Sequence, residues 1–316
     1  MSTKPLFLSE ADALSRLDRS KVKQALRNAF AGLASGTTVQ PAQTVTPFPQ
    51  DEGDCIFYPG MIWDLNLVGV KVSPYISALK RAGKYPVTAY TLLLSASTGE
   101  PILLCDSYAL TTSRTAATSA LALEYLTPPS AKVLSLIGVG KLGLEHLRYV
   151  AEQRKWSEIR VWSPSLGTDP VKAKKTLDTL QADGIAVQVA KSAKAAVQGA
   201  DVVMLCTSSG APVIEVDWLD ANAVVTSIST NSPKAHEIDP GALANFQVFC
   251  DYRVTAPVTA GEMQLAIAAG TWKADEIVGD LPELAVGKVV RPKAGRVFFR
   301  STGLGIEDLA IASLLL

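Results

Sequence analysis

The stretch VLSLIGVGKLGLEHLRY, residues 133–149, passes from a run of β-formers into a glycine-rich turn and then into a segment with helical spacing. Leu144, Leu147 and Val150 recur at intervals that place them on one face of a helix. Strand, tight turn and helix in this order present backbone N–H groups and the positive end of a helix to a phosphate. We therefore predict a dinucleotide-binding turn at Gly138–Gly143.

The three glycines of this turn have different predicted roles. Gly138 permits the tight turn, Gly140 lets the backbone approach the phosphates, and Gly143 lets the helix pack closely on the strand. A GxGxxG pattern also occurs in ordinary glycine-rich connections. The prediction therefore depends on the strand before the turn and the helix after it.

Composition and charge are those of a soluble globular protein. Of 316 residues, 48% are hydrophobic and 19% are charged, and 30 basic residues balance 30 acidic ones. Nothing in this balance favours nucleic acid or a membrane surface as a partner. No apolar run reaches about eighteen residues, and the N-terminal residues lack a signal-peptide pattern.

The cysteines and histidines give no metal or redox pattern. Cys55, Cys105, Cys206 and Cys250 are scattered, which favours buried free thiols in a reducing compartment. His146 and His236 stand apart from any cluster of metal ligands and are expected to be exposed. We predict a cytoplasmic protein without a metal site.

Two different alternations of elements divide the chain. Residues 7–34 are predicted as an amphipathic helical start, and residues 55–105 contain strands joined by turns, typical of an antiparallel sheet. Residues 107–126 form a helix rich in small residues, after which short strands alternate with helices. That second alternation predicts a doubly wound parallel sheet with its ligand at the carboxyl ends of the strands.

The tail, residues 296–308, contains a strand, a glycine turn and the start of a last apolar helix. A tail of this kind can pack back on the first domain, which makes the parallel sheet an insertion. We therefore predict an α/β fold in which a Rossmann-type doubly wound parallel sheet, residues 113–293, is inserted into an α+β substrate-binding and dimerisation domain, residues 1–112 and 294–316.

The choice between NAD and NADP depends on the end of the second strand of the parallel sheet. In an NAD-binding unit, an acidic residue about twenty positions past the glycines holds the ribose 2′-hydroxyl. Here the segment VWSPS places Ser163 and Ser165 there, without a carboxylate. Two hydroxyls can donate to a 2′-phosphate without repelling it, so we predict NADP(H) as the preferred cofactor and NAD(H) as an accepted one. The alternative is an ordinary polar turn.

Two cations lie in segments where a solvated charge is not expected. Lys71 interrupts the apolar run Val68–Val72, and Arg114 lies in a helix of small residues. Buried cations need partners, and an internal ion pair or a snorkelling side chain explains them as well as a bound anion does. On their own these residues predict no more than an anionic substrate.

The sequence resembles a known family at four places. They are VGVKVS around Lys71, LTTSRTAATSALA around Arg114, the turn IGVGKLG and the tail STGLGIEDLA, and they are similar to the ornithine cyclodeaminase/mu-crystallin family. The family includes cyclodeaminases, alanine and arginine dehydrogenases, cyclic ketimine reductases and a lens protein that binds NADPH and thyroid hormone. Because its members are typically homodimers, the resemblance implies a homodimer here.

The resemblance also implies roles for individual residues. Lys71 and Arg114 would hold the substrate carboxylate, and Lys71 would also polarise the C–N centre or relay a proton. Ser229, Ser301 and Thr302 would line the nicotinamide, with Thr302 also toward the substrate. Asp308 is expected to cap or pair rather than to act as a base. The other implied cofactor contacts, apart from Ser163 and Ser165, are Thr115, Gly138, Val139, Gly140, Lys141, Leu142, Gly143, Cys206, Thr207 and Ser208.

Two departures from the family pattern affect the predicted reaction. Cyclodeaminases and alanine dehydrogenases have an aspartate in the turn after the fifth strand, where this chain has Asn231. An amide cannot accept a proton at neutral pH, which argues against internal cyclodeamination. By their places in the family pattern, Lys71 and Asn231 are the catalytic candidates, and of the two only Lys71 can carry a proton. Gln43 stands where many members have an arginine, which leaves a polar but uncharged wall for the substrate.

Hydride transfer does not need the missing aspartate, because Lys71 or bound water can handle the proton. We therefore predict an NADP(H)-dependent oxidoreductase acting on the CH–NH2 or C=N group beside a carboxylate, with L-arginine as the first candidate substrate. The alternatives are a reductase of cyclic ketimines (Δ1-pyrroline-2-carboxylate or Δ1-piperideine-2-carboxylate), then an ornithine cyclodeaminase, or a non-catalytic NADPH-binding protein resembling mu-crystallin.

Overall fold

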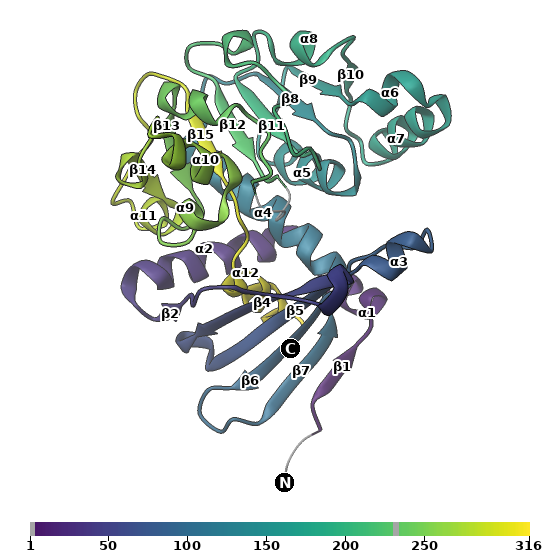
Figure 1. The fold of residues 1–316 in the computed structure, drawn as a ribbon, viewed down its shortest axis with the longest axis vertical. Coiled ribbons are helices and arrows are strands. Elements are labelled where there is room, and N and C mark those ends of the chain that lie inside the picture. Colours follow the sequence, from purple (N-terminus) through teal and green to yellow (C-terminus); the bar gives the residue numbers. More distant parts are fainter. Residues whose placement is uncertain (1–3, 230–233) are drawn as a thin grey trace. The chain divides into compact units, whose positions relative to one another are not determined.

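The computed structural model describes residues 4–229 and 234–316, and the chain divides into two compact units (Figure 1). Unit 1 contains the chain up to Arg114 together with Gly303–Leu316, and unit 2 is Thr115–Thr302. The first boundary falls inside helix α4 (Tyr108–Leu126). The second lies at 302–303 rather than at the predicted 293–294, because strand β15 (Val297–Arg300) belongs to the sheet of unit 2.

Unit 1 is built on a seven-stranded sheet in the order β1-β7-β6-β5-β4-β2, with β3 paired to β4. Neighbouring strands are antiparallel except β1 and β7, which are parallel. The strands are β1 (Leu6–Leu8), β2 (Thr38–Val39), β3 (Thr44–Pro47), β4 (Gly53–Ile62), β5 (Leu67–Ile76), β6 (Tyr90–Ser95) and β7 (Pro101–Asp106).

Helix α12 (Gly305–Ser313) covers one face of this sheet. It contacts β4, β5 and β6, and α2 (Arg19–Ser35) packs against it. In Figure 1 the yellow α12 lies on strands from the purple and blue part of the sequence, so the two ends of the chain build one unit. The close approach needs Gly305, because a Cβ there would overlap the Pro59 carbonyl of β4.

The N-terminal part of unit 1 differs from the predicted single helical segment. Residues 7–34 are divided among β1, α1 (Glu10–Ser15) and α2. Ser9 starts α1 as its N-cap and accepts a hydrogen bond from the Asp12 N–H at 3.3 Å. Residues 74–85 contain the end of β5 and the short helix α3 (Ser77–Arg81).

Unit 2 is an eight-stranded sheet in the order β10-β9-β8-β11-β12-β15-β13-β14, and every paired neighbour is parallel. From β8 the chain adds β9 and β10 on one side and then returns to add β11 and β12 on the other. This doubly wound order confirms the predicted α/β fold class. The strands are β8 (Val133–Ile137), β9 (Glu158–Trp162), β10 (Gln188–Val189), β11 (Val202–Leu205), β12 (Val224–Ser227), β13 (Gln247–Cys250), β14 (Ile277–Asp280) and β15.

Helices lie between most of these strands and complete the core. Strands β11, β12 and β15 are buried along their whole lengths, as expected for central strands covered on both faces. No helix in the part of the chain that the structure describes has the length and apolar run needed to cross a bilayer. The helices are α5 (Lys141–Ala151), α6 (Pro164–Thr168), α7 (Pro170–Ala182), α8 (Ala193–Val197), α9 (Ala256–Thr259), α10 (Gly261–Ala269) and α11 (Leu281–Ala285).

Candidate active site

The glycine turn of unit 2 joins β8 to α5 at the point where the strand order reverses. Gly138 has φ +101°, and a Cβ there would overlap the carbonyl oxygen of Cys206 at the end of β11. A Cβ on Gly143 would overlap the Gly138 carbonyl, whereas one on Gly140 would meet no described atom within 4 Å. Gly138 and Gly143 therefore permit close packing, and Gly140 leaves open space over the backbone.

The start of α5 fits an anionic ligand. Gly140 is its N-cap and makes no side-chain capping hydrogen bond. The first N–H groups of a helix have no partner inside that helix, and they carry the positive end of its dipole. A dinucleotide pyrophosphate supplies the missing acceptors, so these residues fit the predicted cofactor.

The serine turn after β9 lies next to the glycine turn, because the Gly138 N–H donates to the Trp162 carbonyl at 2.9 Å. The hydroxyls of Ser163 and Ser165 are 3.1 Å apart. Pro164, between them, begins α6. The paired hydroxyls can turn their donors toward a phosphate, in keeping with the prediction for the ribose end of the cofactor.

Glu237, which no sequence pattern marked as a site residue, organises the loops after β11 and β12. Its side chain is fully buried. Oε1 accepts hydrogen bonds from the Thr207 N–H (2.6 Å) and hydroxyl (2.7 Å), and Oε2 accepts from the Ser227 hydroxyl (2.7 Å) and the Ser229 N–H (3.0 Å). One carboxylate thus fixes two predicted cofactor contacts, Thr207 and Ser229. A lone glutamate in an irregular segment gives no sequence signal for this.

Further polar groups gather at the carboxyl ends of β12 and β15. The Thr302 hydroxyl donates to Asp251 at 3.1 Å, and its N–H bonds the same carboxylate. The hydroxyl oxygens of Ser229 and Ser301 are buried and have no hydrogen-bond partner within residues 4–229 and 234–316. Buried hydroxyls without partners favour a polar ligand group beside them.

Unit 1 holds a buried cluster of four charges. Lys71 Nζ lies 3.0 Å from Asp308 Oδ2 and 4.0 Å from the centre of the Tyr58 ring. Arg114 Nε donates to Asp308 Oδ1 and Nη1 donates to Glu307 Oε2, each at 3.1 Å. Lys71 is 2% exposed and Arg114 is 4% exposed. Both cations are therefore held in internal ion pairs, which is one of the explanations that the sequence left open.

Three elements bring this cluster together. Lys71 lies on β5, in register with Tyr58 of β4 and on the sheet face that α12 covers. Glu307 and Asp308 lie in the first turn of α12, and Arg114 lies on α4. Asp308 pairs with the cations, as predicted.

Burial and neighbouring charges change the acidity of both cations. Burial lowers the pKa of Lys71 to about 8, while Asp308 opposes this shift and the Arg114 charge reinforces it. Burial also acts to lower the pKa of Arg114, but Asp308 and Glu307 outweigh it and raise that pKa above its usual value. Lys71 can therefore exchange a proton near neutral pH, whereas Arg114 remains a cation.

A family model for the ornithine cyclodeaminase/mu-crystallin family matches residues 3–316 of the chain. The chain belongs to this family. It is 45% identical to the NAD(P)H-dependent anabolic L-arginine dehydrogenase DauB of Pseudomonas aeruginosa, over 98% of this chain and 96% of that one. It is 28% identical to the ketimine reductase mu-crystallin of Macropus fuliginosus, over 99% and 97% of the two chains. The iminosuccinate reductase of Paracoccus denitrificans in complex with NAD+ has the same fold, with a TM-score of 0.89 and 25% identity over 98% and 95%.

Three further predicted site residues lie in different parts of the chain. Asn231 lies outside the described residues. Gln43 is half-buried, but the nearby Gln40 makes the connection to α12, accepting from the Ile306 N–H at 3.1 Å. Thr115 follows Arg114 on α4 and is the first residue of unit 2.

His146 is not exposed as predicted. It is fully buried on α5, with Nδ1 2.8 Å from the Leu142 carbonyl and Nε2 3.1 Å from the Ser119 hydroxyl of α4. Burial lowers its pKa to about 4, so it is neutral at physiological pH. Within the described residues, no three His, Cys, Asp or Glu side chains gather as metal ligands.

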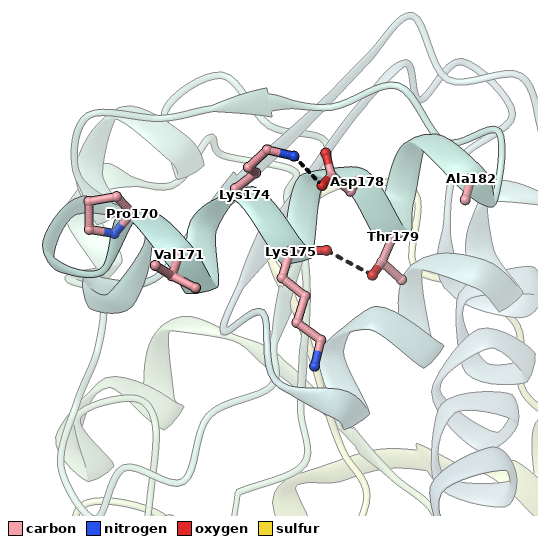
Figure 2. A pocket seen from close by; sticks show the side chains of 7 residues that line it. All are labelled: Pro170, Val171, Lys174, Lys175, Asp178, Thr179 and Ala182. Atoms are coloured by element: carbon pink, nitrogen blue, oxygen red, sulfur yellow. Dashed lines mark hydrogen bonds and ion pairs between the residues drawn. The ribbon is translucent and has the colours of Figure 1, made fainter.

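The hollow drawn in Figure 2 is separate from these groups. It is lined by one face of α7, where Lys174 pairs with Asp178 at 2.7 Å. Both side chains are mostly exposed. The hollow contains none of the predicted site residues, so we assign it no role in the reaction.

Proposed function

We propose that this protein is an NAD(P)(H)-dependent L-arginine dehydrogenase. The single observation that carries the proposal is 45% identity, over nearly the whole of both chains, to an enzyme of that name. The uncapped glycine turn of unit 2 and the buried cations of unit 1 support it, because they suit a dinucleotide and an amino acid carboxylate respectively.

Lys71 and Arg114 have distinct roles in this proposal. When an amino acid becomes an imino acid, the α-carbon gives up a hydride and the nitrogen gives up a proton. A bound nicotinamide cofactor supplies the hydride acceptor, and in the reverse direction the donor. Lys71, with a pKa of about 8, takes the proton from the nitrogen as an amine and returns it as an ammonium in reduction. Arg114 already donates two N–H groups to Glu307 and Asp308, and its remaining donors suit the substrate carboxylate.

We further propose that NADP(H) is preferred over NAD(H). The support is the serine turn at the end of β9, whose Ser163 and Ser165 hydroxyls lie 3.1 Å apart where an NAD-binding unit has a carboxylate. The test is the ratio of kcat/KM for NADPH to that for NADH. A clear preference for NADH would overturn this part of the proposal.

A cyclic ketimine reductase is the second candidate. Similarity to a ketimine reductase over 99% of the chain favours it. Lys71 would serve that reaction equally well, because reduction of a ring C=N needs the same proton at nitrogen. The two candidate reactions differ in the side chain of the substrate. The predicted substrate residue nearest to this question is Gln43 of unit 1, which is half-buried and uncharged.

The oligomeric state and the cellular compartment are further parts of the proposal. We propose a homodimer, because the sheet of unit 1 has an apolar face that α12 does not cover. We also propose the cytoplasm, since Cys55, Cys105, Cys206 and Cys250 are buried and free.

A substrate panel distinguishes these reactions. NADP+ reduction is followed with L-arginine, L-lysine, L-ornithine and L-alanine, and NADPH oxidation with the 2-oxo acid of arginine plus ammonia and with the two cyclic imines. We expect the arginine pair to give the highest kcat/KM. Faster turnover of a cyclic imine would favour the reductase, and proline formation from ornithine without net cofactor change would favour the cyclodeaminase. Tight NADPH binding with no turnover would favour a binding protein.

A further inference from the structure

Asp308 occupies the centre of the charge cluster in unit 1. Its Oδ1 accepts from Lys71 Nζ and from Arg114 Nε, each at 3.1 Å, and its Oδ2 lies 3.0 Å from Lys71 Nζ. The side chain is 1% exposed, so water does not screen these contacts. Glu307, its neighbour on α12, accepts from the other side of the guanidinium, at Arg114 Nη1.

We propose that Asp308 is a positioning residue, which holds the Lys71 ammonium and the Arg114 guanidinium side by side and controls when Lys71 releases its proton. The proposal rests on the function proposed above, in which Lys71 exchanges a proton with the substrate nitrogen. It also explains how Lys71 can carry the proton in a chain that has Asn231 where cyclodeaminases have an aspartate.

The geometry explains why one carboxylate has both effects. Two cations that share one carboxylate lie close enough to repel each other and turn apart when that anion is removed. With Asp308 between them, each cation has a fixed hydrogen-bond partner and the local charge is reduced. The ionisable or charged groups facing Lys71 come from each packed element: Tyr58 of β4, Cys105 of β7, Arg114 of α4, and Glu307 and Asp308 of α12.

The sign of the expected effect follows from these charges. Burial and Arg114 disfavour the ammonium form of Lys71, and Asp308 favours it. Asp308→Asn removes the favourable charge while keeping the size of the side chain, so Lys71 must lose its proton at lower pH. An opposite charge at this distance shifts a pKa by about one to three units.

The matched experiment compares Asp308→Asn with Glu307→Gln in the full-length protein. In the pH profile of kcat/KM for the amino acid, we expect the Lys71 limb near pH 8 to move down by at least about one unit in Asp308→Asn. Glu307→Gln should move it less, because the Glu307 charge acts on Lys71 more weakly than the Asp308 charge does. Equal profiles for Asp308→Asn and the unchanged protein would overturn the proposal, since a residue that only fills space would leave the limb in place.

A second measurement needs no substrate. Because burial lowers the pKa of Lys71 from 10.5 in the unfolded chain to about 8 in the folded one, the folded protein binds fewer protons between these values and its stability rises with pH there. In Asp308→Asn this rise should begin at lower pH, and in Lys71→Met it should disappear. If the increase of stability with pH shifts to lower pH in Asp308→Asn but no substrate reacts, the proposed function fails and the coupling of Lys71 to Asp308 stands. If this increase occurs at the same pH in Asp308→Asn and the unchanged protein, Asp308 does not control Lys71.

Discussion

At the scale of single residues, Gly303 determines where Arg114 can lie. Gly303 has φ +78°, and a Cβ there would overlap Arg114 Nη1. The glycine in the tail motif STGLG thus serves a side-chain approach as well as a turn. Arg114 donates one hydrogen bond to Asp308 and one to Glu307, so a small displacement of its guanidinium affects both bonds.

Gly303→Ala should therefore weaken substrate binding. We expect KM for the amino acid to rise about tenfold or more, because a charged hydrogen bond that is misaligned loses roughly 1.5–3 kcal/mol. The dissociation constant for NADPH should stay within a factor of two or so. The measurement is steady-state kinetics with varied amino acid, combined with NADPH titration.

Gly36 provides the matched control for this substitution. It has φ +82°, nearly the same as Gly303, but a Cβ there would meet no described atom within 4 Å. Gly36→Ala therefore carries the same backbone strain, on the order of 1–2 kcal/mol, without touching Arg114. Equal changes of KM in both variants would mean that backbone strain, not the position of Arg114, is responsible.

The sequence identified both buried cations but not their partners. Lys71 and Arg114 stand out because they interrupt apolar or small-residue segments. Their partner Asp308 is 237 residues from Lys71 and 194 residues from Arg114 along the chain, so no local pattern links them. The sequence did not predict the role of Glu237 for the same reason, because its four hydrogen-bond donors lie at the ends of β11 and β12.

At the scale of elements, helices and strands are predicted most accurately where the sequence period is long or where glycine or proline marks both ends of the segment. The turn from β8 to α5, the small-residue helix α4 and the alternation from β9 to β12 all follow from periodicity and from glycine or proline at their ends. Strand β1 was missed because three apolar residues directly before the α1 cap fit a helix equally well. Strand β14 has only four residues, Ile277–Asp280, and gives no period.

The contact of α4 with α5 predicts a pH dependence of stability. His146 joins these helices through Ser119, and its pKa is about 4 in the folded protein against 6.5 in the unfolded chain. The unfolded chain thus binds more protons between these values, and stability falls as pH falls through that window. We expect a loss of about 2 kcal/mol at pH 5 relative to pH 7, measured by urea unfolding.

His146→Gln isolates this contribution. Other groups also titrate between pH 5 and 7, but they are common to both proteins and cancel in the difference. His146→Gln should be less stable than the unchanged protein at pH 7, because a buried ring and its hydrogen bonds are lost. The difference in free energy of unfolding between the two proteins should become smaller as pH falls. If this difference in free energy of unfolding is constant between pH 5 and 7, His146 has the same pKa in the folded protein and in the unfolded chain.

At the scale of the whole molecule, the sheet of unit 1 is apolar on the face that α12 does not cover. One row of directly paired residues crosses five strands on the face away from Lys71 and α12: Pro59, Val70, Leu92, Leu104 and Phe7. Phe7 is 64% exposed and Leu104 is 36% exposed. An antiparallel sheet with one face in water alternates apolar and polar residues, and this one does not. Such a face is normally covered, and in the proposed homodimer a second copy of the same sheet would cover it with matching chemistry.

Val70→Asp tests this homodimer. Val70 lies in the middle of the row, so a carboxylate there would be buried without a partner in the dimer, at a cost of several kcal/mol per subunit. We expect light scattering after size exclusion to give the mass of a monomer for Val70→Asp and of a dimer for the unchanged protein. Val171→Asp is the control, because Val171 of α7 is 80% exposed in unit 2 and lies outside this face. The dimer through this sheet is wrong if Val70→Asp remains dimeric, or if Val171→Asp dissociates to the same extent, since a general loss of solubility would affect both variants alike.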